Sequence, residues 1–225
     1  MPVPQTPIKA VVFDFDGLMF NTEDIFEAAG RELLQRRGLE LTPQLLSLMM
    51  GRRPMEAFQF MVDMHGMTEP IPDLLEEARL IFFDLIPDML QPMPGLHELL
   101  DHIESRRLPK GVATSSTRSY LEDLLSRHEL LDRFHVTLTA EDVTHGKPHP
   151  EIYLAAAQRL GIQPGEMLVL EDSEAGTNAA AAAEAVIVSV PHQHSRGHDF
   201  SRAHYVAERL DDPWVLERLG IALTR

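Results

Sequence analysis

Short runs of apolar residues recur in the first and last parts of the chain, separated by stretches with helical periodicity. The first run, residues 8–15, is rich in β-branched and aromatic residues and ends at Gly17, which is typical of a buried strand. Strands that alternate with helices predict a parallel α/β sheet. We expect further strands at residues 111–113, 136–138, 167–170 and 186–190, and helices over 151–160 and 178–185.

The segment between residues 19 and 91 has a different pattern, because apolar residues repeat there at helical spacing and no strand pattern interrupts them. The turn-rich sequence over 91–95 ends this segment. We therefore predict an all-helical insert over 19–91 and a discontinuous α/β core over 1–18 and 92–225. The apolar positions with helical spacing are Ile25, Leu33, Leu34, Leu45, Leu48, Phe58, Met61 and Leu74.

Composition narrows the class of protein. The chain has 225 residues, which at roughly 150 residues per domain fits one domain with a smaller insert. The net charge of −15 argues against partners such as nucleic acid or an anionic membrane, because both require a basic face. There is no cysteine, so a disulfide framework and a thiol nucleophile are excluded. With neither a signal-peptide pattern nor a long apolar stretch, we expect a soluble cytoplasmic protein.

Two acidic pairs follow apolar runs directly. Asp14 and Asp16 stand at the end of the first predicted strand, and Glu171 and Asp172 follow the run at 167–170. Ligands of open α/β sheets bind at the carboxyl ends of strands, and carboxylates gathered there favour a hard divalent cation such as Mg²⁺. For an isolated Asp-x-Asp-Gly the alternative is a pair of turn or helix-capping aspartates, but the second pair favours the metal site.

Elements that bind phosphate lie between the two acidic pairs. Thr114, Ser115 and Ser116 follow a predicted strand, and Lys147 stands in Gly-Lys-Pro-His-Pro just before a predicted helix. A hydroxyl with its neighbouring backbone N–H, a lysine ammonium and a helix start each suit an anionic phosphate. They also supply the local cation that an acidic protein needs for an anionic substrate.

These motifs together resemble the haloacid dehalogenase-like hydrolase superfamily, in its branch of phosphatases and β-phosphoglucomutase-like proteins. Four motifs carry the resemblance: Asp14-Phe15-Asp16-Gly17, Thr114-Ser115, Lys147 and Glu171-Asp172-Ser173, in the family's order. The resemblance implies a Rossmann-like parallel-sheet core with an inserted helical cap, and an Mg²⁺-dependent phosphatase that hydrolyses a small, sugar-phosphate-like metabolite.

The resemblance also implies roles for these residues. Asp14 resembles the nucleophile that becomes a transient aspartyl phosphate, and Asp16 resembles the general acid and base. Thr114, the Ser115 amide and Lys147 would bind the phosphoryl group. Mg²⁺ would be held by Asp14, the main-chain carbonyl of Asp16 and Asp172, with Glu171 as a direct or water-mediated partner.

Two other functions stay open. Sugar phosphomutases that resemble β-phosphoglucomutase carry a histidine ten residues after the second aspartate, where this chain has Phe26. They also carry an arginine three residues after the cap glycine, where this chain has Pro54 after Gly51. Both departures favour a phosphatase over a phosphomutase. A non-enzymatic binding protein on the same fold is the third possibility, which the complete motif set disfavours.

Three arginines are candidates for substrate specificity. Arg52 and Arg53 lie in a cationic turn of the insert, with an exposed interhelical turn as the alternative, and Arg118 follows Thr114, with a solvated helix residue as the alternative. The histidine-rich segment 192–204 is predicted to be a surface loop rather than a metal site. We expect a monomer, with a dimer as the alternative.

Overall fold

The computed structural model describes residues 6–49, 52 and 54–221. It divides into two compact units: residues 1–20 with 92–225 form the core unit, and residues 21–91 form the helical unit. The first break lies after Phe20 rather than after residue 18, because Met19 and Phe20 are fully buried and Phe20 pairs with Pro92 in an isolated bridge.

The core unit is built on a six-stranded sheet in the order β3-β2-β1-β4-β5-β6. Every pairing in this sheet is parallel, with Val12 of the central strand opposite Gly111 on one side and Val169 on the other. This confirms the predicted α/β class with a parallel-sheet core. The strands are β1 (Ala10–Phe13), β2 (Lys110–Ala113), β3 (Val136–Leu138), β4 (Met167–Glu171), β5 (Val186–Ser189) and β6 (Tyr205–Val206).

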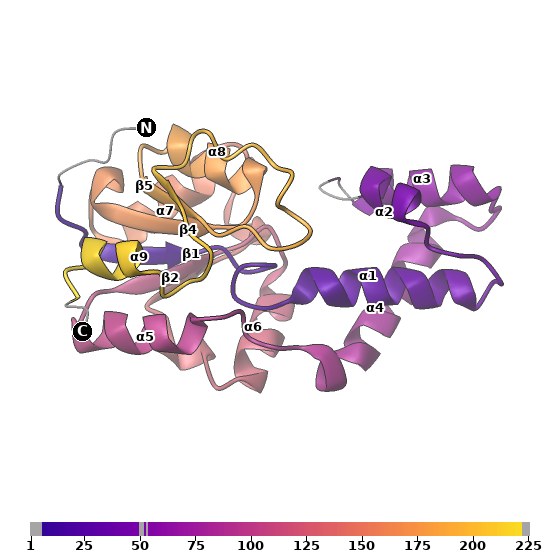
Figure 1. Cartoon of the computed structure of the whole chain (residues 1–225), viewed down its shortest axis with the longest axis horizontal. Helices are drawn as coiled ribbons and strands as arrows, with labels where there is room; N and C mark the ends of the chain where they lie inside the picture. The colour runs from indigo at the N-terminus through magenta and orange to yellow at the C-terminus, as the bar shows by residue number, and fades with distance from the viewer. Residues whose placement is uncertain (1–5, 50–51, 53, 222–225) are drawn as a thin grey trace. The chain divides into compact units, whose positions relative to one another are not determined.

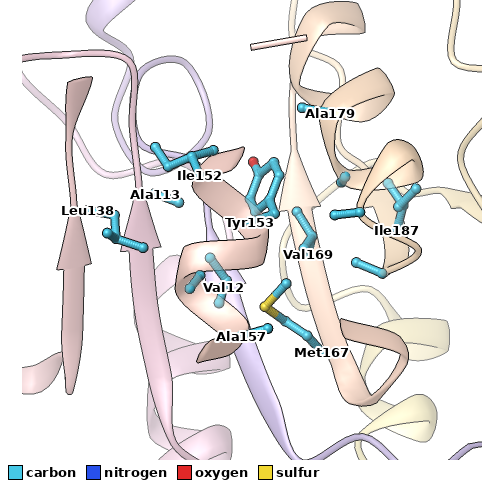
Figure 2. Close-up of a cluster of buried hydrophobic side chains, with 14 of the residues drawn as sticks. Val12, Ala113, Leu138, Ile152, Tyr153, Ala157, Met167, Val169, Ala179 and Ile187 are labelled. Atoms are coloured by element: carbon cyan, nitrogen blue, oxygen red, sulfur yellow. The ribbon is translucent and has the colours of Figure 1, made fainter. Parts of the chain in front are cut away.

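Helices cover both faces of this sheet. Helices α7 (Glu151–Leu160) and α8 (Glu174–Ala182) bury small and apolar side chains against one face, as Figure 2 shows for Tyr153, Ala157 and Ala179. Helices α5 (Leu96–Ser105) and α6 (Arg118–Arg127) lie on the other side (Figure 1). The unit also contains α9 (Pro213–Arg218) and the short 3-10 helices η1 (Leu131–Arg133), η2 (Ala140–Asp142) and η3 (Pro164–Glu166).

The prediction of a helix over 178–185 was wrong at both ends, since α8 runs from Glu174 to Ala182. The helix begins earlier because the Ser173 side chain accepts a hydrogen bond from the Gly176 N–H and caps its first turn. It ends where Glu184 takes a positive φ of 62°. The prediction was based on the alanine run, whereas the Ser173 cap determines where α8 begins.

The described part of the helical unit contains helices and no strand, as predicted. They are α1 (Thr22–Gln35), α2 (Pro43–Met49), α3 (Pro54–His65) and α4 (Ile71–Met89), and α1 packs along α4. Among the predicted apolar positions, Ile25, Leu33, Leu45, Met61 and Leu74 are fully or almost fully buried. Across the described residues of both units, none of the helices combines the length and apolar character needed to span a membrane.

Candidate functional site

The site lies where the three central strands of the core sheet end. Strand β1 lies between β2 and β4, so the residues that follow these strands come together at one edge. The backbone ladder continues past the strand ends, because the Asp14 N–H donates to Leu170 O at 2.9 Å and the Thr114 N–H donates to Leu138 O at 2.9 Å. These bonds fix Asp14 beside the end of β4 and Thr114 beside the end of β3.

Three carboxylates form a buried acidic cluster at this edge. Asp14, Glu171 and Asp172 each offer an oxygen, and these oxygens lie within 4.8 Å of one another. All three residues are buried. Burial raises the pKa of Asp14 well above its usual value, and nearby Glu171 and Asp172 raise it further although Lys147 opposes them. Burial, followed by the charge of Glu171, likewise raises the pKa of Asp172. Crowded, desolvated carboxylates of this kind take up a proton or bind a cation.

Lys147 supplies one positive charge to this cluster. Its ammonium donates to Asp14, to Glu171 at 2.6 Å and to the Ala113 carbonyl at 3.0 Å. The same ammonium lies 5.1 Å from the ring centroid of Tyr153. Burial lowers the pKa of Lys147, but the charges of Asp14 and Glu171 outweigh it and hold the pKa well above its usual value. Lys147 is therefore a fixed cation bound to the predicted nucleophile.

Glu171 has donors on both of its carboxylate oxygens. Oε1 accepts hydrogen bonds from Lys147 and from the Tyr153 hydroxyl, and Oε2 accepts from the backbone and hydroxyl of Ser173. A Cβ at Gly176 would overlap this carboxylate, so glycine is required for its position. Four donors fill the acceptor sites of a carboxylate. This geometry favours Glu171 as the anchor of Lys147 and leaves Asp14 and Asp172 as the side chains for a metal.

Asp16 is held apart from the acidic cluster by hydroxyl groups. Its Oδ2 accepts from Ser116 Oγ at 2.6 Å and from Thr114 Oγ1 at 3.4 Å, and its Oδ1 accepts from Tyr120 at 2.8 Å. Thr114 is buried, and Ser115 is exposed on the loop that follows β2. The predicted acid–base residue and the predicted phosphate-binding hydroxyl are therefore in direct contact, on the β2 side of Asp14.

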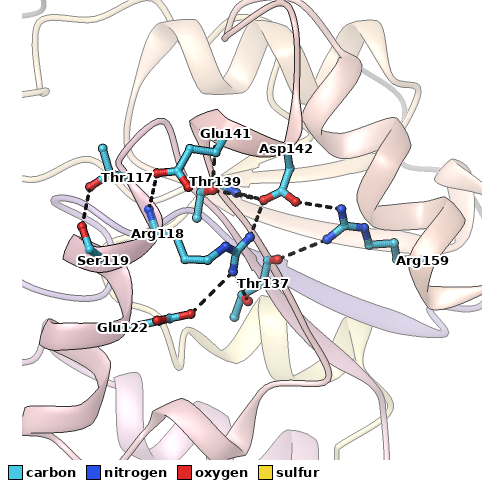
Figure 3. Close-up of polar contacts among 9 residues, drawn as sticks. All are labelled: Thr117, Arg118, Ser119, Glu122, Thr137, Thr139, Glu141, Asp142 and Arg159. Atoms are coloured by element: carbon cyan, nitrogen blue, oxygen red, sulfur yellow. Dashed lines mark hydrogen bonds and ion pairs between the residues drawn. The ribbon is translucent and has the colours of Figure 1, made fainter.

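Two of the three candidate specificity arginines lie among the described residues, and each contacts groups of its own unit. The Arg118 guanidinium donates to Asp142 at 2.5 Å and to Thr137 at 3.2 Å (Figure 3), so it binds protein groups at the β3 side of the core unit. Arg52, in the helical unit, donates to Leu48 O at 2.7 Å and lies over the Phe60 ring at 4.7 Å. Arg53 lies outside the described residues.

The site includes three residues that could not be identified from the sequence, namely Tyr120, Tyr153 and His192. His192, predicted to lie in a surface loop, has its Nε2 2.9 Å from Asp172 Oδ2, and its side chain is 10% exposed. The pairing of β4 with β5 brings the segment after β5 to the segment after β4. Spacing along the chain carries no signal for this contact, because twenty residues separate the two.

A second group with metal-ligand chemistry lies on the surface. His145, His149 and Glu151 also have ligand atoms within 4.8 Å, and both histidines are exposed. The Glu151 carboxylate accepts hydrogen bonds from the backbone N–H groups of Thr144 and His145, which hold the loop around Lys147. That role in the loop explains why Glu151 is close to both histidines.

Comparison with known proteins finds relatives that match most of the chain. The family model described as haloacid dehalogenase-like hydrolase matches residues 11–190. A phosphorylated carbohydrates phosphatase of Thermotoga maritima is 31% identical over 78% of this chain and 82% of its own length. A bifunctional riboflavin kinase/FMN phosphatase of Arabidopsis thaliana is 30% identical over 95% of this chain, which spans only 56% of that relative.

A solved structure extends the comparison to the fold. A hydrolase of the same family from Deinococcus radiodurans, crystallised with bound phosphate and sodium, superposes with a TM-score of 0.74. It is 28% identical, and the match covers 90% of this chain and 91% of that one.

Proposed function

The chain belongs to the haloacid dehalogenase-like hydrolase family, and from this premise we propose that it is a metal-dependent phosphatase acting through an aspartyl phosphate. The resemblance predicted from four motifs is thus confirmed, and the chain is an enzyme of the hydrolase class. The named relatives are phosphatases, consistent with the predicted class of phosphoric monoester hydrolase.

The observation that carries the proposal is the charge of the acidic cluster. Asp14, Glu171 and Asp172 bring three negative charges when ionised, and Lys147 contributes one positive charge, so two negative charges remain. A divalent cation with oxygen ligands matches both this excess and this donor set. We therefore propose that Mg²⁺ is held by the carboxylates of Asp14 and Asp172 with the main-chain carbonyl of Asp16.

Asp14 has the surroundings of a nucleophile. Burial raises the pKa of Asp14, and Lys147 binds Asp14 and opposes this effect by stabilising the ionised form, which has a lone pair to attack phosphorus. In the first step the Asp14 oxygen forms a bond to phosphorus, and the bond from phosphorus to the leaving oxygen breaks. When bound, Mg²⁺ would neutralise charge on the phosphoryl oxygens. Thr114, the Ser115 amide and Lys147 are our proposed phosphoryl-binding groups, and all three follow elements of the core unit.

Asp16 is our proposed proton carrier. It gives a proton to the leaving alkoxide in the first step and takes one from water in the second. The water oxygen then bonds to phosphorus, the bond from phosphorus to Asp14 breaks, and phosphate is released with the Asp14 carboxylate restored. The hydroxyl groups of Ser116 and Tyr120 fix the Asp16 carboxylate for these transfers. Each step balances with substrate and water alone.

The substrate we propose is a small phosphorylated metabolite of the sugar-phosphate kind. The support is the name of the Thermotoga maritima relative, a phosphatase of phosphorylated carbohydrates. To test this, the purified protein is incubated with Mg²⁺ and a panel of such metabolites, and both phosphate release and isomerisation are measured.

In that test Asp14→Asn removes the nucleophile, and we expect kcat to fall roughly 10⁴-fold or more. Asp16→Asn removes only proton transfer, and the expected loss is about 10²- to 10⁴-fold. The matched control is Asp101→Asn, whose side chain is 72% exposed in the same unit, and it should keep full activity. Removal of divalent cations with a chelator should abolish turnover, and Mg²⁺ should restore it. Activity that survives Asp14→Asn or the chelator would refute the mechanism, and an isomer without free phosphate would identify a phosphomutase.

A further inference from the structure

His192 contacts the acidic cluster and has no part in the proposed mechanism. Its Nε2 lies 2.9 Å from Asp172 Oδ2, and both side chains are almost buried. Gly17 lies beside this contact: a Cβ there would come within 2.6 Å of His192 Nε2 and 2.8 Å of Asp172 Oδ2. The glycine of the first motif thus leaves the space in which the imidazole and the carboxylate meet.

The backbone around the imidazole determines which nitrogen carries the proton. The His194 N–H donates to His192 Nδ1 at 3.3 Å, so Nδ1 acts as an acceptor. In the neutral ring the proton is then on Nε2, and Nε2–H donates to Asp172 Oδ2. The hydrogen bond therefore has one direction, from the imidazole to the carboxylate.

A turn built by the neighbouring residues holds the imidazole in place. The His192 N–H donates to Ser195 Oγ at 3.1 Å, and the Ser195 N–H donates back to His192 O at 3.0 Å. Ser195 is itself buried. The segment after β5 is also bonded to β4, because the Val190 N–H donates to Glu171 O at 2.6 Å. These bonds hold the His192 imidazole in one position against the Asp172 carboxylate.

We propose that His192 is a positioning residue that holds Asp172 Oδ2 and thereby presents the other carboxylate oxygen to the divalent cation. This inference rests on the metal site of the proposed function. The contact with His192 fixes Oδ2 of Asp172, which directly follows β4, and so restricts the rotation of this carboxylate. A carboxylate that is oriented before binding holds a metal more tightly than one that must be ordered on binding.

Direct metal binding tests the proposal without any substrate. Mn²⁺, which reports its own binding by electron paramagnetic resonance, is titrated into the metal-free full-length protein and its variants. His192→Leu introduces an apolar side chain of similar size and removes the donor, and we expect the Mn²⁺ Kd to rise about 10- to 100-fold. His192→Gln keeps an N–H donor of similar reach and should recover most of this loss. His198→Asn is the matched control, since the His198 ring contacts the Glu174 N–H, and its Kd should match that of the unaltered protein.

The outcomes separate this inference from the function on which it rests. A Kd for His192→Leu within about twofold of the unaltered protein would overturn the positioning role while leaving the metal site intact. Equal losses in the leucine and glutamine variants would also overturn it, because the N–H donor would then make no difference. Asp172→Asn serves as the reference: if this change leaves Mn²⁺ binding unaffected, the cation does not bind at the cluster, and both the metal site and the inference fail.

Discussion

The two units of the chain place their charged residues differently. The core unit buries Asp14, Glu171 and Asp172 around the ammonium of Lys147. In the described part of the helical unit, the one buried polar residue is Thr22, which is uncharged. The ion pairs within that unit, such as Arg31 with Glu27, lie at its surface.

This difference indicates which unit carries the chemistry. Taking a charge out of water costs several kcal/mol, so an excess of buried carboxylates destabilises a fold unless something binds there. Ion pairs at the surface contribute about 0–1 kcal/mol and impose no such cost. The core unit therefore carries a cost in stability that the helical unit does not, and the proposed metal site accounts for it.

Asp172→Asn is expected to have the largest effect on stability, because it removes one of the buried charges of the core unit. The pKa of Asp172 is raised in the folded protein. The protonated carboxyl group therefore contributes its full stabilisation below its ordinary pKa of 3.8, and this stabilisation is lost as the pH rises from 3.8 through the raised pKa. At pH 7.5, without metal, the neutral amide should therefore raise the melting temperature by about 5 °C. The gain should shrink as the pH falls toward 4, where the unaltered carboxyl group takes up a proton.

A bound divalent cation should make the unaltered protein more stable than Asp172→Asn. With saturating Mg²⁺, the unaltered protein should gain about 3 kcal/mol at a hundredfold excess over Kd, and the variant should gain little. Thermal unfolding with and without Mg²⁺ measures both effects, and Asp101→Asn is the exposed control. If Asp172→Asn is less stable than the unaltered protein without metal at pH 7.5, the cluster does not hold more negative charge than Lys147 compensates.

Much of the core was predictable because its signals are local. The β-branched runs identified five of the six strands to within about two residues, which is the usual uncertainty of such boundaries. Strand β6 has only two residues, Tyr205 and Val206, and one of them is half exposed, so it leaves no apolar run. Three of the four motifs stand at strand ends and the fourth, with Lys147, precedes α7, so their residues could be named before their contacts were known.

The contacts that depend on tertiary structure were not predictable. The His192 side chain reaches Asp172 only because β5 pairs with β4. One of the four hydrogen bonds to the Glu171 carboxylate comes from the hydroxyl of Tyr153, a residue of α7. Both contacts combine residues that no spacing rule connects. Sequence patterns thus identified the residues of the predicted site, and the sheet determines what each of them touches.

A second, smaller effect is expected at an ion pair of intermediate burial in the core unit. Asp142 accepts hydrogen bonds from Arg118, Arg159 and Thr139 (Figure 3), and its side chain is 15% exposed. Burial raises the pKa of Asp142, but these partners outweigh it and lower the pKa to about 2. Asp142→Asn should therefore cost about 2 kcal/mol at pH 7.

The pH dependence of this loss has a defined sign. A carboxyl group whose pKa is lowered in the fold stabilises it above its ordinary pKa of 3.8, and that stability is lost as the pH falls to about 2. The difference between Asp142→Asn and the unaltered protein should therefore narrow across this range. Urea unfolding at pH 7, 5 and 3 measures it, with exposed Asp132→Asn as the control. A constant difference at all three values would rule out the carboxylate charge as its source.

The smallest effect is expected in the helical unit, where Glu77 of α4 binds Arg37, in the turn after α1, at 2.6 Å. Hydrogen bonding from Arg37 lowers the pKa of Glu77, yet both side chains stay in contact with water, at 30% and 21% exposure. Glu77→Gln should therefore cost about 0.5 kcal/mol, and 1 M salt, which shortens the screening length to about 3 Å, should remove most of that loss. Glu76→Gln, which breaks a more exposed pair with Arg79, is the control. A loss above about 2 kcal/mol that persists in salt would contradict the contrast between the units, because a charge of the helical unit would then behave like a buried one.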